Sequence, residues 1–322
     1  MKHRNLAIFI PHVGCGHRCS FCDQHRISGQ SQPPTPENIK KLIETCVNSP
    51  DHRPELTQIA FFGGSFTCIQ KEQMRAYLEV TKPFIERGDF AGIRISTRPD
   101  GITPEILELL KRYHVVNIEL GAQSMDPSVL IKANRGHTPE DTIRASRLIH
   151  DSGIELGLQM LIGLPGDTKE KAFWTAQKLA ALRPREMRLY PAVVFPGTDL
   201  HDQYLEGNYH PLSVEQALDW TVPIAAYLRD QEIHLLKVGL HQADGAVAGA
   251  FHPAFGEMVR TGLWNERLKK KLPQNAGKIL VQVQPNEISI ALGQKRSNIQ
   301  YWADRGYNLE ITIRDDPHAI KI

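Results

Sequence analysis

The stretch Cys15-Gly-His-Arg-Cys19-Ser-Phe-Cys22 decides the fold. It follows a short apolar run, residues 6–11, which the sequence predicts to be a β-strand. The cysteines therefore lie in a loop at the carboxyl end of a strand, where α/β barrels carry their active sites. Three thiolates can bind three irons of a cubane cluster and leave the fourth iron open to a small molecule. The same cysteines could instead form a structural zinc site, completed by His12, His17 or His25.

Composition and charge are those of an ordinary soluble globular protein. The 322 residues are 41% hydrophobic and 23% charged, with a formal net charge of +2. No apolar run approaches the roughly 20 residues that a membrane span needs, and residues 6–10 are too short a run for a signal peptide. We therefore expect a cytoplasmic protein without membrane contact. In a reducing compartment, clustered cysteines indicate metal chemistry and not disulfides.

The sequence up to about residue 240 alternates short apolar runs with longer segments of helical period. This pattern is typical of a β/α protein with a parallel sheet. Thr35, Thr103 and Thr138 are predicted helix N-caps, because each is followed by Pro-Glu. Six strands are too few for a closed eight-stranded barrel, so we predict an α/β fold with a partial (β/α)6 TIM-like barrel. The predicted strands are residues 6–11, 58–62, 92–96, 115–120, 156–162 and 187–194.

Further motifs follow the cysteine loop in a fixed order. Phe21 precedes the last cysteine, and Gly63-Gly64-Ser65 closes the second predicted strand. The cysteine spacing resembles the radical S-adenosylmethionine (SAM) signature, and the whole series resembles the branch with Elongator subunit 3 and the oxygen-independent coproporphyrinogen oxidases. The later segments of the series are Ser96-Thr-Arg-Pro-Asp100, Glu119-Leu-Gly-Ala-Gln-Ser124, Asn134-Arg-Gly-His137, Met160-Leu-Ile-Gly-Leu-Pro165, Tyr190-Pro191, Pro196-Gly-Thr198 and His252-Pro-Ala-Phe-Gly256.

The resemblance implies two cofactors, a [4Fe–4S] cluster and SAM. Cys15, Cys19 and Cys22 would hold the cluster, and an external low-potential donor would supply the electron that cleaves SAM to a 5′-deoxyadenosyl radical. Arg135 would bind the SAM carboxylate, because a planar guanidinium pairs with a carboxylate in bidentate fashion. Alternatively, the polar residues of the series only satisfy strand ends. The SAM contacts that the resemblance implies are Phe21, Gly63, Gly64, Ser65, Ser96, Gln123, Arg135, Gln159 and Leu161, with Ser65, Ser96 and Gln159 at positions where relatives carry carboxylates.

The C-terminal part has a different character. The Gly-, Ala- and His-rich stretch 239–253 predicts a boundary between a barrel at 1–245 and a small basic α+β domain at 246–322. The order strand, short helix, basic turn, helix and strand resembles a KH module of the kind found in bacterial transcription factors. In a KH module a GxxG turn brings backbone amides to nucleic-acid phosphates. Here the turn is Gly293-Gln-Lys295-Arg296, with arginine in place of the second glycine.

Charge in this region favours phosphate contact. Residues 257–300 hold eight Lys or Arg against three Glu. Gly293, Lys295 and Arg296 are therefore the candidate nucleic-acid contacts. The basic run could instead be a solvated face of a domain that only covers the barrel.

These observations predict a radical SAM enzyme that modifies RNA, with tRNA favoured. The Elongator enzyme has an acetyltransferase domain after its radical SAM domain, and this chain is too short to hold one, so acetyl transfer is not implied. One alternative is a porphyrinogen-type oxidase or haem-handling relative. The other is an RNA-binding protein whose iron–sulfur cluster only stabilises the fold.

Overall fold

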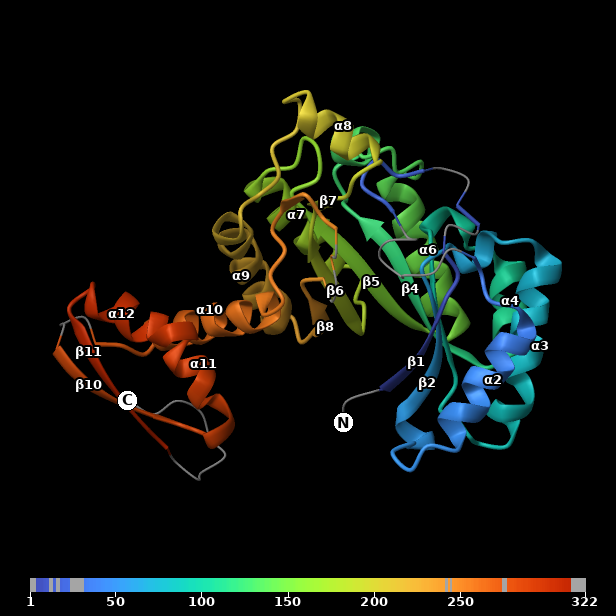
Figure 1. The fold of residues 1–322 in the computed structure, drawn as a ribbon, viewed down its shortest axis with the longest axis horizontal. Helices are drawn as coiled ribbons and strands as arrows, with labels where there is room; N and C mark the ends of the chain where they lie inside the picture. The colour runs from blue at the N-terminus through green and yellow to red at the C-terminus, as the bar shows by residue number, and fades with distance from the viewer. Residues whose placement is uncertain are drawn as a thin grey trace.

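Seven parallel strands form one curved sheet in the order β1-β2-β3-β4-β5-β6-β8 (Figure 1). The computed structural model describes residues 4–11, 14–15, 18–23, 32–240, 243, 245–273 and 277–313. The first and last strands of this order lie at opposite ends of the sheet, so the barrel is partial, as expected. The strands are β1 (Arg4–Phe9), β2 (Thr57–Phe62), β3 (Ile93–Thr97), β4 (Val115–Gln123), β5 (Glu155–Ile162), β6 (Glu186–Pro191) and β8 (His234–Val238).

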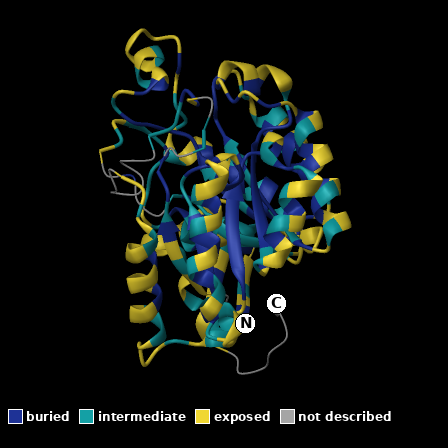
Figure 2. Ribbon diagram, turned by 90° about the vertical axis from the view of Figure 1, so that its right-hand side faces the viewer, coloured by how far each residue is buried: buried dark blue, intermediate teal, exposed yellow. Residues whose placement is uncertain are grey.

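Helices cover the outer face of the sheet, and their outward sides are exposed (Figure 2). Thr35, Thr103 and Thr138 each accept a hydrogen bond from a backbone amide three residues later, which confirms the predicted N-caps. Among the described helices, none is long and apolar enough to cross a membrane. The helices of the barrel are α2 (Pro36–Val47), α3 (Lys71–Glu86), α4 (Pro104–Arg112), α5 (Pro127–Lys132), α6 (Pro139–Ser152), α7 (Lys169–Ala180), α8 (Asp199–Leu205) and α9 (Val214–Asp230).

The inner face of the sheet carries a buried network of charges. Arg94 Nη1 donates to Glu119 Oε1 at 2.8 Å and also contacts Glu186. Arg188 donates to both oxygens of Glu119, from Nε at 2.5 Å and from Nη2 at 2.9 Å. Burial raises the pKa of Glu119, but Arg188 and Arg94 outweigh it and hold that pKa below its ordinary range. Two arginines thus balance two glutamates beneath the carboxyl ends of the strands.

The sheet differs from the prediction by one strand. The sequence predicts six strands, whereas β8 adds a seventh beside β6. β8 is only five residues long and reads His-Leu-Leu-Lys-Val, which shows no strict alternation of apolar and polar residues. The predicted strand 187–194 is also interrupted, because β6 ends at Pro191 and the next two residues form β7 (Val193–Val194), which pairs antiparallel with β9 (Ala248–Gly249).

The C-terminal unit, residues 255–313, has a core of its own. Its strands β10 and β11 are parallel, with two short helices between them. Helix α10 joins this unit to the barrel: Phe255 and Val259 pack in the barrel core, whereas Trp264 and Leu268 pack in the small core. The change of core therefore falls inside α10, and the predicted division at 245/246 stays a prediction. The elements are α10 (Phe255–Lys269), β10 (Gly277–Val283), α11 (Ile288–Leu292), α12 (Ser297–Ala303) and β11 (Tyr307–Ile313).

Replacing Arg94 tests the buried network. Arg94→Leu leaves Glu186 buried with only an amide donor from Asn117, so we expect the free energy of unfolding to fall by about 3–5 kcal/mol. Urea unfolding of the apoprotein measures this. Arg87→Leu is the control, because Arg87 is 57% exposed and its pair with Asp89 contributes about 1 kcal/mol or less. Equal losses in the two variants would show that the network does not support the fold.

Candidate active site

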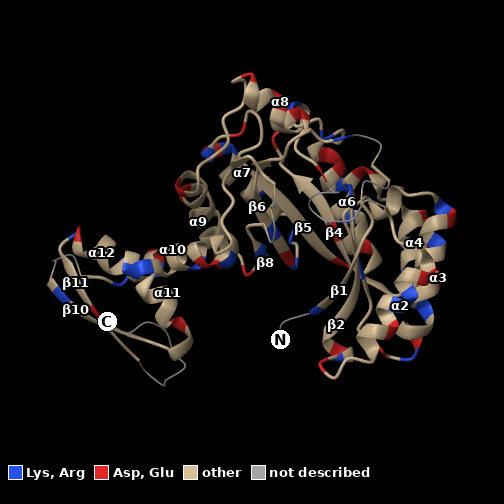
Figure 3. Cartoon of the chain, viewed as in Figure 1, with Lys and Arg blue, Asp and Glu red and all other residues tan. Residues whose placement is uncertain are grey.

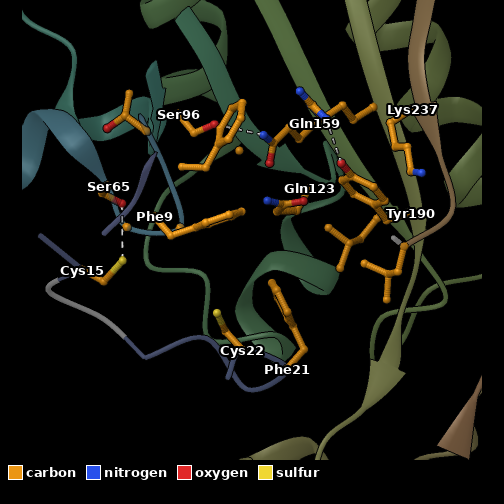
Figure 4. Close-up of a pocket in the computed structure, with 18 of the residues that line it drawn as sticks. Phe9, Cys15, Phe21, Cys22, Ser65, Ser96, Gln123, Gln159, Tyr190 and Lys237 are labelled. Atoms are coloured by element: carbon orange, nitrogen blue, oxygen red, sulfur yellow. Dashed lines mark hydrogen bonds between the residues drawn. The ribbon is translucent and has the colours of Figure 1, made fainter. Parts of the chain in front are cut away.

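A cavity of about 760 Å³ lies against the inner face of the sheet, bordered by the cysteine loop, Cys15 to Cys22 (Figure 4). Its size lies within the range of about 300–1,000 Å³ typical of small-molecule sites. All of the residues that the sequence predicts as SAM contacts line this cavity: Phe21, Gly63, Gly64, Ser65, Ser96, Gln123, Arg135, Gln159 and Leu161.

The cysteine loop places two thiols at the cavity and one beneath it. Cys15 and Cys22 line the cavity, and Cys19 is buried. In the described part of the chain no three Cys, His, Asp or Glu side chains converge on a single-ion site. A cubane cluster does not require that convergence, because each cysteine binds a different iron. His12, His17 and His25, the candidate fourth ligands of a zinc site, lie outside the described residues.

The thiols of the loop lie close enough together to affect the pKa of Cys22. Burial, followed by the neighbouring thiolates of Cys19 and Cys15, raises the pKa of Cys22 to about 12. A thiol in this position keeps its proton until a cation takes its place. Cys15 Sγ lies 3.4 Å from Ser65 Oγ, which comes from the Gly-Gly-Ser turn after β2.

The end of β4 presents a strained residue to the cavity. Gln123 has φ 64°, a left-handed conformation that is uncommon outside glycine, and the pairing of β4 with β5 shifts register beside it. Its side-chain oxygen is buried and has no hydrogen-bond partner among the described residues. Strain and an unsatisfied polar atom at one position are typical of a ligand site.

Arg135 lies between the cysteine loop and the end of β4. Its Nη1 donates to Cys19 Sγ at 3.1 Å and its Nη2 donates to the carbonyl of Gly121 at 2.6 Å. A Cβ at Gly121 would lie 2.6 Å from that Nη2, so a side chain there would displace the guanidinium from this position. Nε of Arg135 is buried and has no hydrogen-bond partner in the described part of the chain. The guanidinium therefore supports the cysteine loop and keeps one donor for a ligand.

On the opposite wall, two of the predicted SAM contacts, Ser96 and Gln159, are linked to the charge network. Gln159 Nε2 donates to Glu119 Oε2 at 3.0 Å and lies 3.3 Å from Ser96 Oγ. Glu119 thus fixes the amide of Gln159 in one orientation. Phe21 packs with Leu161 and Leu164 and completes an apolar wall.

The residues present fit an iron–sulfur cluster with SAM. Three thiols come from one loop, and the unsatisfied atoms of Gln123 and Arg135 offer an acceptor and a donor for the polar groups of a ligand. Comparison with known proteins agrees. The Radical SAM superfamily profile matches residues 9–179, and the profile of the Radical_SAM C-terminal domain matches residues 184–265.

The chain belongs to the radical SAM superfamily. The cofactors of this superfamily are a [4Fe–4S] cluster and SAM.

Three relatives show which branch this radical SAM protein resembles. An uncharacterized protein of Methanocaldococcus jannaschii is 30% identical over 245 residues, which cover 74% of this chain and 72% of that protein. The haem chaperone HemW of Bacillus subtilis is 25% identical over 242 residues, covering 73% of this chain and 62% of HemW. The tRNA uridine(34) acetyltransferase of M. jannaschii is 32% identical over 128 residues, covering 39% of this chain and 24% of that enzyme. The chain thus spans less than two thirds of the last two relatives.

Two solved structures share the fold. Elp3 of Methanocaldococcus infernus gives a TM-score of 0.65 at 20% identity, covering 85% of this chain and 65% of that one. Coproporphyrinogen III oxidase of Escherichia coli gives a TM-score of 0.51 at 20% identity, covering 71% and 53%.

Sequence reasoning missed four residues of the cavity. Arg188, Lys237, Phe9 and Phe62 line it, and none of them was predicted to be a site residue. The alternation of Glu186, Arg188 and Tyr190 along β6 was the available signal, because every second residue of a strand faces the same side. Gly293, Lys295 and Arg296 lie in the C-terminal unit and do not line the cavity.

Removing one thiol tests the cluster. Cys15→Ala, Cys19→Ala or Cys22→Ala should abolish SAM cleavage, measured as release of 5′-deoxyadenosine after anaerobic reconstitution, because two thiolates hold the cluster incompletely. Cys46→Ala, a change on α2 outside the cavity, should keep wild-type iron content and cleavage. Normal cleavage by any loop variant, or only zinc in anaerobically purified protein, would contradict the assignment.

Removing the Arg135 side chain tests the SAM contact. Arg135→Ala should raise the dissociation constant for SAM about ten- to a hundredfold, the effect of losing a charge-assisted hydrogen bond. Equilibrium dialysis measures this, and iron and sulfide per chain should stay at the wild-type level. Arg144→Ala on the outer face of α6, with the Arg144 side chain 52% exposed, should change neither value. Unchanged SAM affinity in Arg135→Ala would leave Arg135 with a structural role only.

Proposed function

We propose that this chain is a radical SAM enzyme that modifies RNA, with tRNA as the favoured substrate. The proposed ligands of the cluster are Cys15, Cys19 and Cys22. The cluster and SAM would supply the radical chemistry of the superfamily. An external low-potential protein would donate the electron.

Residues of the chain itself would bind and orient SAM. Ser65, Gln123 and Arg135 would hold the amino-acid end of SAM, because they lie beside the cysteine loop and carry unsatisfied or exchangeable hydrogen bonds. Ser96 and Gln159 would orient the ribose, with Gln159 fixed by Glu119. Leu161 and Phe21 would cover the adenine side and exclude water. These roles need no proton transfer through Glu119, which its arginine partners keep ionised.

The observation that favours RNA is the turn between α11 and α12. Lys295 (φ 50°) and Arg296 (φ 61°) are both left-handed and exposed, so their cationic side chains face solvent together, while the amide of Arg296 donates to the carbonyl of Gly293 at 3.1 Å. Gly293 precedes them at φ 71°, and a Cβ there would lie 2.4 Å from Ser297 Oγ. Glycine is therefore needed at the position where a GxxG turn has its first glycine.

The surrounding C-terminal unit holds this turn in place. Asn298, which is 2% exposed, donates to the carbonyl of Ile290 and accepts from Asn265 of α10. Trp302 Nε1 donates to the same Asn265. The turn is thus tied to α10, and basic residues continue along α10 and beside α12 (Figure 3). A rigid basic turn of this kind suits contact with phosphates without reading sequence.

The second candidate function is porphyrinogen oxidation or haem handling. It is favoured by the similarity to HemW, which covers 73% of this chain. The visible spectrum of protein purified from its own cells distinguishes the two, because a bound tetrapyrrole absorbs strongly and bound RNA does not. Release of 5′-deoxyadenosine by the reconstituted protein would in turn separate both enzymes from an RNA-binding protein without catalysis.

Charge reversal at the turn tests RNA contact. Lys295→Glu with Arg296→Glu should weaken binding to unrelated RNA sequences and flatten the log–log salt dependence by about one unit per lost contact. Filter binding over a salt series measures both. Lys40→Glu with Lys41→Glu makes the same charge change on α2 and should leave the salt slope unchanged. If the turn variant keeps wild-type affinity and slope, the C-terminal unit does not bind RNA phosphates.

A further inference from the structure

The cavity carries a cation that none of the proposed SAM contacts uses. Lys237 of β8 lines the cavity and is the register partner of Arg188 on β6, so the two side chains project from neighbouring positions of one face. Figure 4 shows Lys237 on the side opposite Cys15 and Cys22, with Tyr190 beside it. The amino group therefore lies across the cavity from the proposed cluster.

The two neighbouring cations are not equivalent. Arg188 is bound through two hydrogen bonds to Glu119, and its Nη1 lies 3.5 Å from the hydroxyl of Tyr190. Within the described ranges no carboxylate pairs with Lys237, and no hydrogen bond engages its amino group. Arg94 and Arg188 already balance Glu119 and Glu186, so the charge of Lys237 remains uncompensated. A cation in a partly enclosed site without a partner attracts an anionic ligand.

The cavity also has aromatic walls, which come from β1 and β2 at the other edge of the sheet from β8. Phe9 of β1 and Phe62 of β2 have ring centroids 6.3 Å apart with a tilt of 47°, and both line the cavity. Figure 4 shows the Phe9 ring reaching into the cavity between Ser65 and Gln123. The Arg188 guanidinium lies 5.2 Å from the Phe62 ring centroid, which fixes that ring against the network. Flat apolar surfaces of this kind pack well against a planar ring.

We propose that the part of the cavity between Lys237 and Phe62 is the substrate subsite, in which Lys237 binds the phosphate of one nucleotide and Phe62, whose ring lies beside Arg188, packs against its base. A nucleotide carries both features that the subsite offers, an anionic group and a planar ring. The subsite also faces the proposed SAM residues across the same cavity, as a hydrogen-atom donor must. The choice of a nucleotide rests on the proposed action on RNA. Lys237 and Phe62 are binding and positioning residues for that substrate.

The probe pair is uridine 5′-monophosphate and uridine, which differ only in the phosphate. Reconstituted protein with SAM should bind the monophosphate about tenfold more tightly than uridine, the effect of one charge-assisted pair. Lys237→Met keeps most of the aliphatic stem and should lose that preference, whereas Lys237→Arg should retain it. Lys41→Met, on the outer surface of α2, is the matched control and should behave as wild type. Isothermal titration at millimolar ligand measures all four proteins.

Three outcomes would overturn the subsite. Wild-type protein could show no preference for the monophosphate, or Lys237→Met could keep the preference, or Lys237→Met could lose SAM affinity and so place Lys237 on the cofactor. Coproporphyrin is tested as a second ligand. If its binding depends on Lys237 and the nucleotide shows no phosphate-dependent binding, Lys237 pairs with a tetrapyrrole carboxylate and the nucleotide subsite is refuted.

The same measurements separate the subsite from the RNA function. The Lys295/Arg296 double variant should retain the preference for the monophosphate, because its turn lies outside the cavity. A wild-type RNA salt slope in that double variant would refute the RNA contact and leave the Lys237 result standing. A flattened salt slope in the double variant would support the RNA contact. If wild-type protein then bound uridine 5′-monophosphate no more tightly than uridine, only the subsite would be refuted.

Discussion

The ion network on the inner face of the sheet is the constraint on which the site depends. Barrel interiors are usually filled by branched apolar side chains, whereas this one buries Arg94 and Glu119 at about the same depth, 1% exposed each. Each buried charge alone would cost several kcal/mol, so neither is tolerable without its partners. Glu119 satisfies this requirement by accepting hydrogen bonds from Arg94, Arg188 and Gln159. One carboxylate thereby sets the position of a proposed ribose contact and of the cation beside the proposed substrate subsite.

The network also explains why the sheet can remain open. In a closed barrel the first and last strands pair, and the interior packs solid. Here β1 and β8 are the two edges of the sheet, and the polar inner face holds a cavity between them in place of an apolar core. The edges contribute Phe9 and Lys237 to that cavity. The proposed RNA substrate would need such an open side, because only one nucleotide could enter while the rest of the polymer stayed outside.

The sequence predicted what local chemistry determines and missed what strand register determines. The cysteine spacing, the N-caps at Thr35, Thr103 and Thr138 and most strands each depend on residues within a few positions of one another. Arg188 and Lys237 are 49 positions apart and become neighbours only through the pairing of β6 with β8. The contact of Arg135 with Cys19 spans 116 positions and depends on the missing side chain of Gly121. No periodicity in one sequence encodes such pairings.

Helix α10 determines how the C-terminal unit can act on the barrel. The helix is continuous from Phe255 to Lys269, and its two halves belong to different cores. A hinge between the cores would therefore have to break helical hydrogen bonds or expose Val259 and Trp264, which are both 1% exposed. Both are costly, so bending within α10 is disfavoured. The position of the Lys295–Arg296 turn relative to the barrel is therefore set by α10 and not by a flexible connection.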